Sequence, residues 1–101
     1  MIRHTVVFRL KHKSGSQEEA SFLAAAKTLA TIPGVRKFEV LQQISPMSQF
    51  KFGLSMEFSG QPAYDGYNIH PLHVAFVQGR WKPEVEDYLE IDYIPVHSAR
   101  G

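Results

Sequence analysis

The sequence predicts an α+β domain of ferredoxin-like βαββαβ type, in which a four-stranded antiparallel sheet carries helices on one face. Two observations predict it. Apolar and polar residues alternate along several short segments, as in half-buried strands. Between these segments lie two helical stretches, the second of them interrupted by a proline. The chain has 101 residues, 44% of them hydrophobic, so we expect one domain that covers residues 1–101.

The clearest strand patterns lie over residues 2–11 and 50–58. In the first, one face carries Ile2, His4, Val6, Phe8 and Leu10; in the second, one face carries Phe50, Phe52, Leu54, Met56 and Phe58. Because alternate side chains of a strand share a face, His4 is expected inside. Residues 35–44 and 88–95 are the predicted second and fourth strands.

The helices have recognisable start and stop signals. Ser16 and Glu19 have the spacing of a capping box, in which each side chain bonds the backbone N–H of the other residue. The Ile-Pro-Gly sequence at 32–34 ends this helix. A short helix is expected over 62–69, and Pro71 begins another, since the residue before a proline avoids helical angles. Residues 81–87 are expected to add one or two turns.

The composition argues against several classes of function. The chain has no cysteine, which excludes disulfides, thiolate metal sites and a cysteine nucleophile. No segment has the roughly 20 apolar residues of a membrane span, and no signal peptide is recognisable, so a cytoplasmic protein without membrane contacts is expected. The net charge of +1 comes without a basic tract, and Leu54 and Glu57 replace aromatic positions of the RNA-binding signature. Nucleic acid is therefore not an expected partner.

Most of the candidate chemistry lies between Tyr64 and His73. His73 falls in the first turn of the helix that begins at Pro71, where the helix dipole favours a neutral imidazole that can accept a proton. Tyr67 can donate a hydrogen bond to a carbonyl oxygen and stabilise an enolate. The alternative is structural: His70 then caps the helix, and the two tyrosines pack with their hydroxyls at the surface.

Three further groups complete the candidates. His4 is either a satisfied core residue or a pocket residue, the latter if it meets His73 at one cavity. On the last strand, Asp92 either orients a histidine or faces solvent, and Glu90 is expected to face solvent. No third ligand has a suitable spacing beside His70 and His73, so neither a metal site nor a cofactor is predicted.

The chain resembles the stress-responsive dimeric α/β-barrel family, called Dabb. The resemblance rests on residues 2–11, on Ile-Pro-Gly-Val at 32–35, on the Y-x-x-H-P-x-H element at 67–73 and on D-Y-x-P at 92–95. It implies a homodimer of ferredoxin-like protomers, joined through their sheets into a barrel, with a pocket in each protomer. The sheet face opposite the helices suits such pairing, because it carries Val7, Leu41 and either Ile91 or Ile94.

The best understood members of this family are polyketide cyclases similar to olivetolic acid cyclase. They use a histidine base and a tyrosine for an intramolecular aldol condensation. Their base falls on His73 and their tyrosine on Tyr67, while their first-strand histidine falls on His4 and their final-strand aspartate on Asp92. The resemblance thus implies catalytic roles for these four residues.

Two departures point to another ligand, since Ala25 stands in place of a pocket tyrosine and Phe52 in place of a histidine. The favoured function is proton abstraction and aldol-type cyclisation of a small, apolar, polyketide-like carbonyl compound. The alternatives are a noncatalytic ligand-binding or stress-response homodimer, and a haem-dependent monooxygenase of the same superfold. The expected substrate-binding residues are Phe8, Phe22, Leu54, Met56, His70 and Phe76.

Overall fold

Strand β1 (Ile2–Leu10) lies inside the sheet, between β3 (Phe52–Phe58) and β4 (Val85–Tyr93). Strand β2 (Arg36–Gln42) pairs with the other side of β3, so the strand order is β2-β3-β1-β4, and every pairing is antiparallel. The computed structural model describes residues 1–97. It confirms the predicted ferredoxin-like order of elements and the four-stranded antiparallel sheet.

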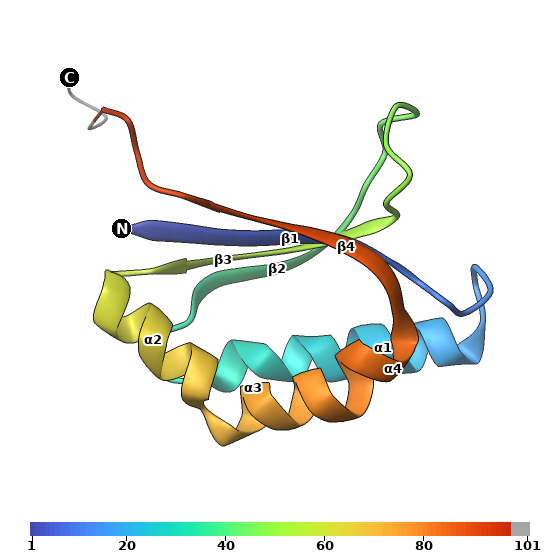
Figure 1. The fold of residues 1–101 in the computed structure, drawn as a ribbon, viewed down its shortest axis with the longest axis horizontal. Coiled ribbons are helices and arrows are strands. Elements are labelled where there is room, and N and C mark those ends of the chain that lie inside the picture. The colour runs from blue at the N-terminus through green and yellow to red at the C-terminus, as the bar shows by residue number, and fades with distance from the viewer. Residues whose placement is uncertain (98–101) are drawn as a thin grey trace.

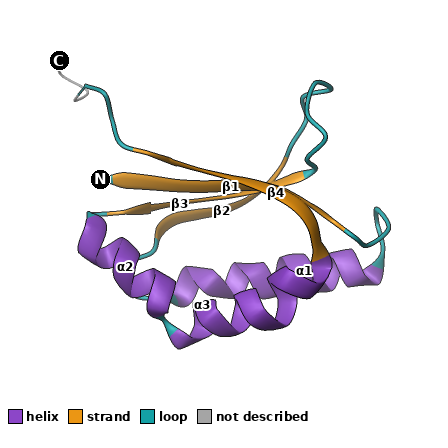
Figure 2. Cartoon of the chain, in the orientation of Figure 1, coloured by secondary structure: helices purple, strands orange, loops and turns teal. Residues whose placement is uncertain are grey.

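All helices lie on one side of this sheet (Figures 1 and 2). On the opposite side, only the β2–β3 loop and the segment after β4 rise from the sheet (Figure 1). Within residues 1–97, no helix has both the length and the apolar content needed to cross a membrane. The helical elements are α1 (Gln17–Lys27), the 3-10 turn η1 (Thr28–Thr31), α2 (Gln61–Ile69), α3 (Pro71–Phe76), the π-helical turn η2 (Val77–Trp81) and α4 (Lys82–Glu84).

The N-terminus of α1 confirms half of the predicted capping box. The Ser16 hydroxyl accepts a hydrogen bond from the N–H of Glu19 at 3.2 Å. The Glu19 carboxylate, however, accepts from the N–H of Gly15 at 3.1 Å rather than from that of Ser16. The reason lies in the preceding turn, where the N–H of Ser16 already donates to the carbonyl of Lys13 at 3.1 Å. The side chain therefore reaches one residue further back.

Gly34 allows the end of η1 to approach α2. Its φ of +90° lies in the left-handed region, which glycine adopts without steric cost. A Cβ atom at this position would lie 3.3 Å from the Cβ of Ala63 on α2. Both the backbone angle and the close contact therefore favour glycine where the first helical stretch turns back into the sheet.

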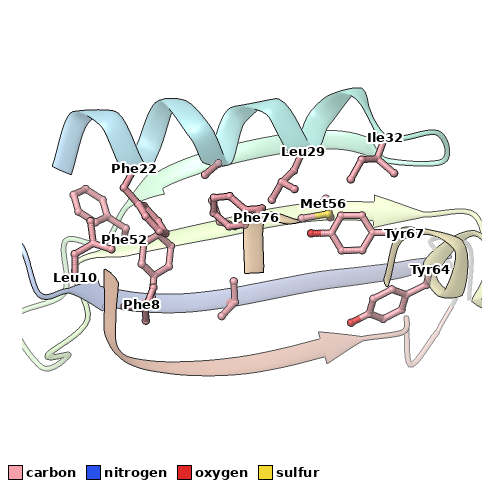
Figure 3. Packing of buried hydrophobic residues seen from close by; sticks show 14 of the residues in the cluster. Phe8, Leu10, Phe22, Leu29, Ile32, Phe52, Met56, Tyr64, Tyr67 and Phe76 are labelled. Carbon is pink, nitrogen blue, oxygen red and sulfur yellow. The ribbon is translucent and has the colours of Figure 1, made fainter. Parts of the chain in front are cut away.

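The core lies between the sheet and the helices. Alternation along β1 buries Val6, Phe8 and Leu10, while Phe22 enters from α1 (Figure 3). The rings of Phe8 and Phe22 lie 5.7 Å apart, a separation at which aromatic pairs stabilise one another. The other buried apolar residues are Ala26, Leu29, Ile32, Phe52, Leu54, Met56, Phe58, Tyr64, Tyr67, Phe76 and Val85.

The boundaries of all four strands differ from the prediction, and β1 ends at Leu10 rather than at residue 11. Strands β2 and β3 are shorter at the β2–β3 loop, and β4 begins at Val85 rather than at residue 88. The early start of β4 has a clear cause. Val85 is an apolar residue that pairs with Leu10 across a β-bulge, and the N–H of Lys11 donates to the carbonyl of Glu84 at 2.9 Å.

The face of the sheet opposite the helices exposes large apolar side chains. Leu89 pairs with Val7 and Ile91 with Thr5, so these side chains share the outer face with Leu41 of β2. Leu41, Leu89 and Ile91 are 43%, 51% and 41% exposed. Of the two isoleucines considered from the sequence, Ile91 lies in the sheet, whereas Ile94 follows the end of β4.

Two methionines provide a direct test of this packing. Met56 is 0% exposed, and Met47 is 92% exposed. Met56→Ala should lower the free energy of unfolding by about 2–5 kcal/mol, because it leaves a cavity in the core. Met47→Ala should change it by less than about 0.5 kcal/mol. Urea denaturation of both variants checks the difference, and equal losses would contradict the packing described.

Candidate functional site

A pocket of about 460 Å³ lies between the sheet and the helical layer. Strands β1, β3 and β4 contribute one wall, and α2, α3 and η2 contribute another. Its polar side chains include His4, Tyr67, Asn68, His73 and Glu90. Its apolar and aromatic lining consists of Val6, Leu29, Leu54, Phe76, Val77, Trp81, Val85 and Tyr88. Such a lining suits a small ligand with a large apolar surface and a few polar groups.

The break between α2 and α3 sets the hydrogen bonding of His73. In a continuous helix, the N–H of Leu72 would bond to the carbonyl of Asn68. Because Pro71 interrupts the helix, the N–H of Leu72 instead donates to Nδ1 of His70 at 3.1 Å. The carbonyl of Asn68 is bonded by Nδ1 of His73 at 3.0 Å. One proline thus makes a backbone acceptor available to the candidate base.

This contact determines which nitrogen of His73 is available in the neutral ring. A carbonyl oxygen only accepts, so Nδ1 carries the proton and Nε2 keeps its lone pair. Burial lowers the pKa of His73 below its ordinary value of 6.5, although the hydrogen bond to Asn68 acts in the opposite direction. His73 therefore lines the pocket as a neutral imidazole, and none of residues 1–97 forms a hydrogen bond with its acceptor Nε2.

Tyr67 lies beside this imidazole. The ring centroids of Tyr67 and His73 are 4.3 Å apart, and those of Tyr67 and His4 are 6.0 Å apart. Burial, and secondarily the negative charge of Glu90, raise the pKa of the Tyr67 phenol. The hydroxyl therefore stays protonated as a donor, and none of residues 1–97 forms a hydrogen bond with it. Figure 3 shows this hydroxyl directed along the layer between sheet and helices.

His4 is held by side chains from β4 and α2. Its Nδ1 lies 2.6 Å from Oδ1 of Asp92, its partner across the β1–β4 pairing. The Tyr64 hydroxyl lies 2.9 Å from the same Nδ1, 2.7 Å from Oδ2 of Asp92 and 3.0 Å from Oε2 of Glu90. Burial raises the pKa of Asp92, but hydrogen bonds from His4 and Tyr64 outweigh it and hold the pKa below its usual value.

The structure brings together the candidates at 4, 67 and 73 around one pocket. Asp92 contacts His4 rather than His73. Of the six expected substrate-binding residues, Leu54 and Phe76 line this pocket. The other four do not: Phe8, Phe22 and Met56 are fully buried in the core, and His70 uses Nδ1 to cap α3.

Several residues of the site were not expected from the sequence, among them Glu90, Tyr64, Trp81 and Tyr88. Glu90 lines the pocket instead of facing only solvent, because it pairs with Val6 on the inward face of the sheet. The available signal was the spacing of two residues between Glu90 and Asp92, which places both side chains on the same face of the strand. The role of Tyr64 depends on how α2 lies against β4. Trp81 comes from the π-helical turn η2 and Tyr88 from β4, and the sequence left open how these two elements close the pocket.

Within residues 1–97, one group of side chains has the composition of a metal site. Donor atoms of His4, Glu90 and Asp92 lie within 4.8 Å of one another. The Tyr64 hydroxyl, however, is within hydrogen-bond distance of all three, so a metal ion would have to displace it. We therefore assign these four side chains to a hydrogen-bond network.

The chain is similar to several known proteins. The family model for the Stress Responsive A/B Barrel Domain, Dabb, matches residues 2–95. A Dabb family protein with a ferredoxin-like fold from Mesorhizobium loti is 61% identical over 95% of this chain and 97% of that chain, with a TM-score of 0.94. No curated protein matches.

Two more distant structures have the same architecture. A dimeric protein of unknown function with a ferredoxin-like fold, from Bacteroides fragilis, is 26% identical over 91% of this chain and 93% of its own, with a TM-score of 0.70. Hydroxynitrile lyase from Passiflora edulis is 17% identical over 96% and 94%, with a TM-score of 0.83. The likeness to the lyase shows the fold alone.

The lowered pKa of His73 makes a prediction about stability. Because the unfolded chain binds this proton more readily, the contribution of neutral His73 is present above about pH 6.5 and is lost as the pH falls below it. His73→Asn keeps a donor toward the carbonyl of Asn68 but does not titrate. Urea denaturation at about pH 7.5 and about pH 5 should show a larger loss of stability in the wild type than in the variant. Equal losses would contradict the neutral assignment.

Proposed function

Because the chain belongs to the stress-responsive A/B barrel family, Dabb, we propose that its pocket binds a small, largely apolar carbonyl compound and abstracts a proton beside the carbonyl. The observation that carries this proposal is the contact between Tyr67 and His73. A phenol donor and an imidazole acceptor lie with ring centroids 4.3 Å apart on the wall of one pocket. A carbonyl compound needs one of each to form an enolate.

His73 is the base in this reaction. Its Nδ1–H is engaged by the carbonyl of Asn68, so the lone pair on Nε2 takes the proton from the carbon next to the substrate carbonyl. The electron pair of that C–H bond moves toward the carbonyl oxygen, which becomes an enolate oxyanion. Partial burial keeps the imidazole neutral before the reaction and thus ready to accept.

Tyr67 stabilises the oxyanion. Its buried hydroxyl has a raised pKa, so it donates a hydrogen bond without losing its proton. The enolate carbon then attacks a second carbonyl of the same molecule, which forms a carbon–carbon bond and closes a ring. The oxygen of the attacked carbonyl takes up a proton, His73 releases the proton that it took, and the product is an isomer of the substrate.

The ligand is expected to differ from that of the polyketide cyclases that this sequence resembles. Phe52, which stands where they have a histidine, is buried and lies 5.9 Å from Phe8 between ring centroids. Ala25, which stands for their pocket tyrosine, packs against the core. Aromatic rings therefore fill this end of the sheet, and the pocket is confined to the part beside Trp81, Tyr88 and the polar side chains.

We further propose that the working form is a homodimer joined through the outer faces of two sheets. Leu41, Leu89 and Ile91 expose apolar surface there, and no other part of residues 1–97 covers it. The similar protein from Bacteroides fragilis is described as dimeric. A contiguous apolar face on a sheet is the kind of surface that a second copy buries.

Single substitutions test the reaction. With a panel of small diketones and polyketide-like esters, His73→Ala should lower turnover by about 10²–10⁴-fold, and Tyr67→Phe by about 10²–10³-fold. His97→Ala and Tyr93→Phe change the same residue types at exposed positions and should leave turnover unchanged. Product formation is followed by chromatography, and thermal unfolding checks that each variant folds.

The outcomes separate the two main alternatives. Unchanged turnover in His73→Ala would overturn the role of the base. A compound that raises the melting temperature of the wild type, but yields no product, would select noncatalytic binding by the same pocket.

The dimer is tested at the centre of the exposed sheet face. Leu89→Asp places a charge opposite Val7 and should convert a dimer into a monomer in sedimentation experiments, because an unpaired charge is costly in an apolar interface. Ile69→Asp, at an exposed position of α2, is the matched control and should remain dimeric. A monomeric wild type, or a dimeric Leu89→Asp variant, would contradict pairing through this face.

A further inference from the structure

His4 is flanked by two carboxylates, although one is sufficient to orient it. Its Nδ1 lies 2.6 Å from Asp92 and 3.5 Å from Glu90. Building on the proposed function, we propose that Glu90 and Tyr64 are positioning residues that hold His4 as an imidazolium. The pocket then presents an acid, the Nε2–H of His4, near the base His73.

The hydrogen bonds of this network assign the protons. Asp92 Oδ1 lies at the shortest distance from His4 and takes the Nδ1 proton. The hydroxyl of Tyr64 has one proton and faces two carboxylate oxygens, one of Asp92 at 2.7 Å and one of Glu90 at 3.0 Å. Tyr64 thereby keeps both carboxylates close to the imidazole. The remaining ring nitrogen, Nε2, belongs to a side chain that lines the pocket.

The charges around His4 favour its cationic form. Within residues 1–97, His4 is the only basic side chain within 4 Å of Asp92 or Glu90. The neighbouring acidic groups of β4 already have a partner, because Arg9 lies 3.2 Å from Glu86 and 3.5 Å from Asp87. A neutral His4 would leave the two carboxylates without a countercharge at the edge of a partly apolar pocket.

The other groups that face His4 do not supply that charge. From α2, Tyr64 and Tyr67 contribute only phenols whose pKa burial raises, so both stay neutral. From α3, His73 contributes an imidazole whose pKa burial lowers. From β3, the residue paired with His4 is Met56, which is uncharged. Two histidines of one pocket therefore lie in opposite electrostatic surroundings.

Opposite surroundings are what separate an acid from a base at one pH. In the aldol step, His73 takes the proton from carbon, and the electron pair of the attacked carbonyl moves to its oxygen. That oxygen takes the Nε2 proton of His4, so the substrate gains one proton and loses one. The enzyme then holds a protonated His73 and a neutral His4, and a proton exchanged through solvent restores the starting state.

The protonation of His4 can be measured directly. In protein with ¹⁵N-labelled histidine, the ring nitrogen shifts should show His4 mainly as an imidazolium and His73 mainly neutral at about pH 7. Glu90→Gln should lower the ratio of imidazolium to imidazole at His4 about tenfold, because it removes one nearby opposite charge. Glu86 also lines the pocket, and its carboxylate is paired with Arg9. Glu86→Gln is therefore the matched control and should leave the His4 signals unchanged.

Tyr64 is tested in the same way. Tyr64→Phe keeps the ring that stacks on Phe58 at 4.9 Å but removes the hydroxyl that joins the two carboxylates. It should lower the imidazolium fraction of His4 in the same direction as Glu90→Gln. In turnover assays, Glu90→Gln should move the alkaline limb of the kcat profile to lower pH by about one unit, an effect that a purely structural role would not produce.

The outcomes are independent of the reaction itself, because the spectra need no substrate. A neutral His4 in the wild type at about pH 7 would overturn the proposal, as would a Glu90→Gln variant with an unchanged His4. A charged His4 in a protein whose turnover does not depend on His73 would support the network and contradict only the proposed reaction.

Discussion

The alternation of side chains along β1 is the constraint on which both the core and the pocket depend. Because β1 lies between β3 and β4, its inward side chains determine what the helices can cover. Val6, Phe8 and Leu10 supply apolar surface on this face, and His4 stands on the same face near the start of the strand. A shift of one residue in the pairing would expose the core residues and place Arg3 and Thr5 inside. The same strand register therefore buries the core residues and places His4 at the pocket.

A second constraint is the proline between α2 and α3. In most helices the backbone groups at an interruption bond to water or to a cap. Here the freed N–H of Leu72 bonds to one imidazole, and the carbonyl of Asn68 bonds to another. The Y-x-x-H-P-x-H element of the sequence is thus a structural unit: its proline interrupts the helix, its first histidine caps the new one, and its second histidine takes the vacated acceptor.

The parts of the structure that were predictable from sequence are those governed by local rules. Period-two alternation located β1 and β3, and the restriction that Pro71 imposes on His70 located the helix break. The network around His4 follows different rules. Glu90 contacts Tyr64 only because the register of β4 places it opposite Val6 on the inward face of the sheet, and because α2 lies against that edge. Strand register and helix docking depend on contacts between distant parts of the chain, so local sequence patterns do not predict them.

The same limit explains the misplaced pocket walls. Phe8 and Phe22 have the chemistry of ligand-binding residues, but Phe22 of α1 packs directly against Phe8 of β1 and leaves no space between them. The space lies instead where η2 and the start of β4 bring Trp81 and Tyr88 to the rim. Large aromatic residues are equally suitable for a core and for a pocket wall. Which of the two they form is decided by how the helices pack against the sheet.

Trp81 is the chain's single indole, and it stands in the wall of the pocket at 5.5 Å from the ring of Tyr88 and 5.0 Å from that of Phe8. Its fluorescence therefore reports on this one place in the molecule, without background from any other tryptophan. A compound that enters the pocket changes the polarity around the indole and thus its emission. Trp81 is accordingly an intrinsic fluorescent probe of ligand binding in the pocket. Libraries of unlabelled compounds can be screened with it before any reaction is known.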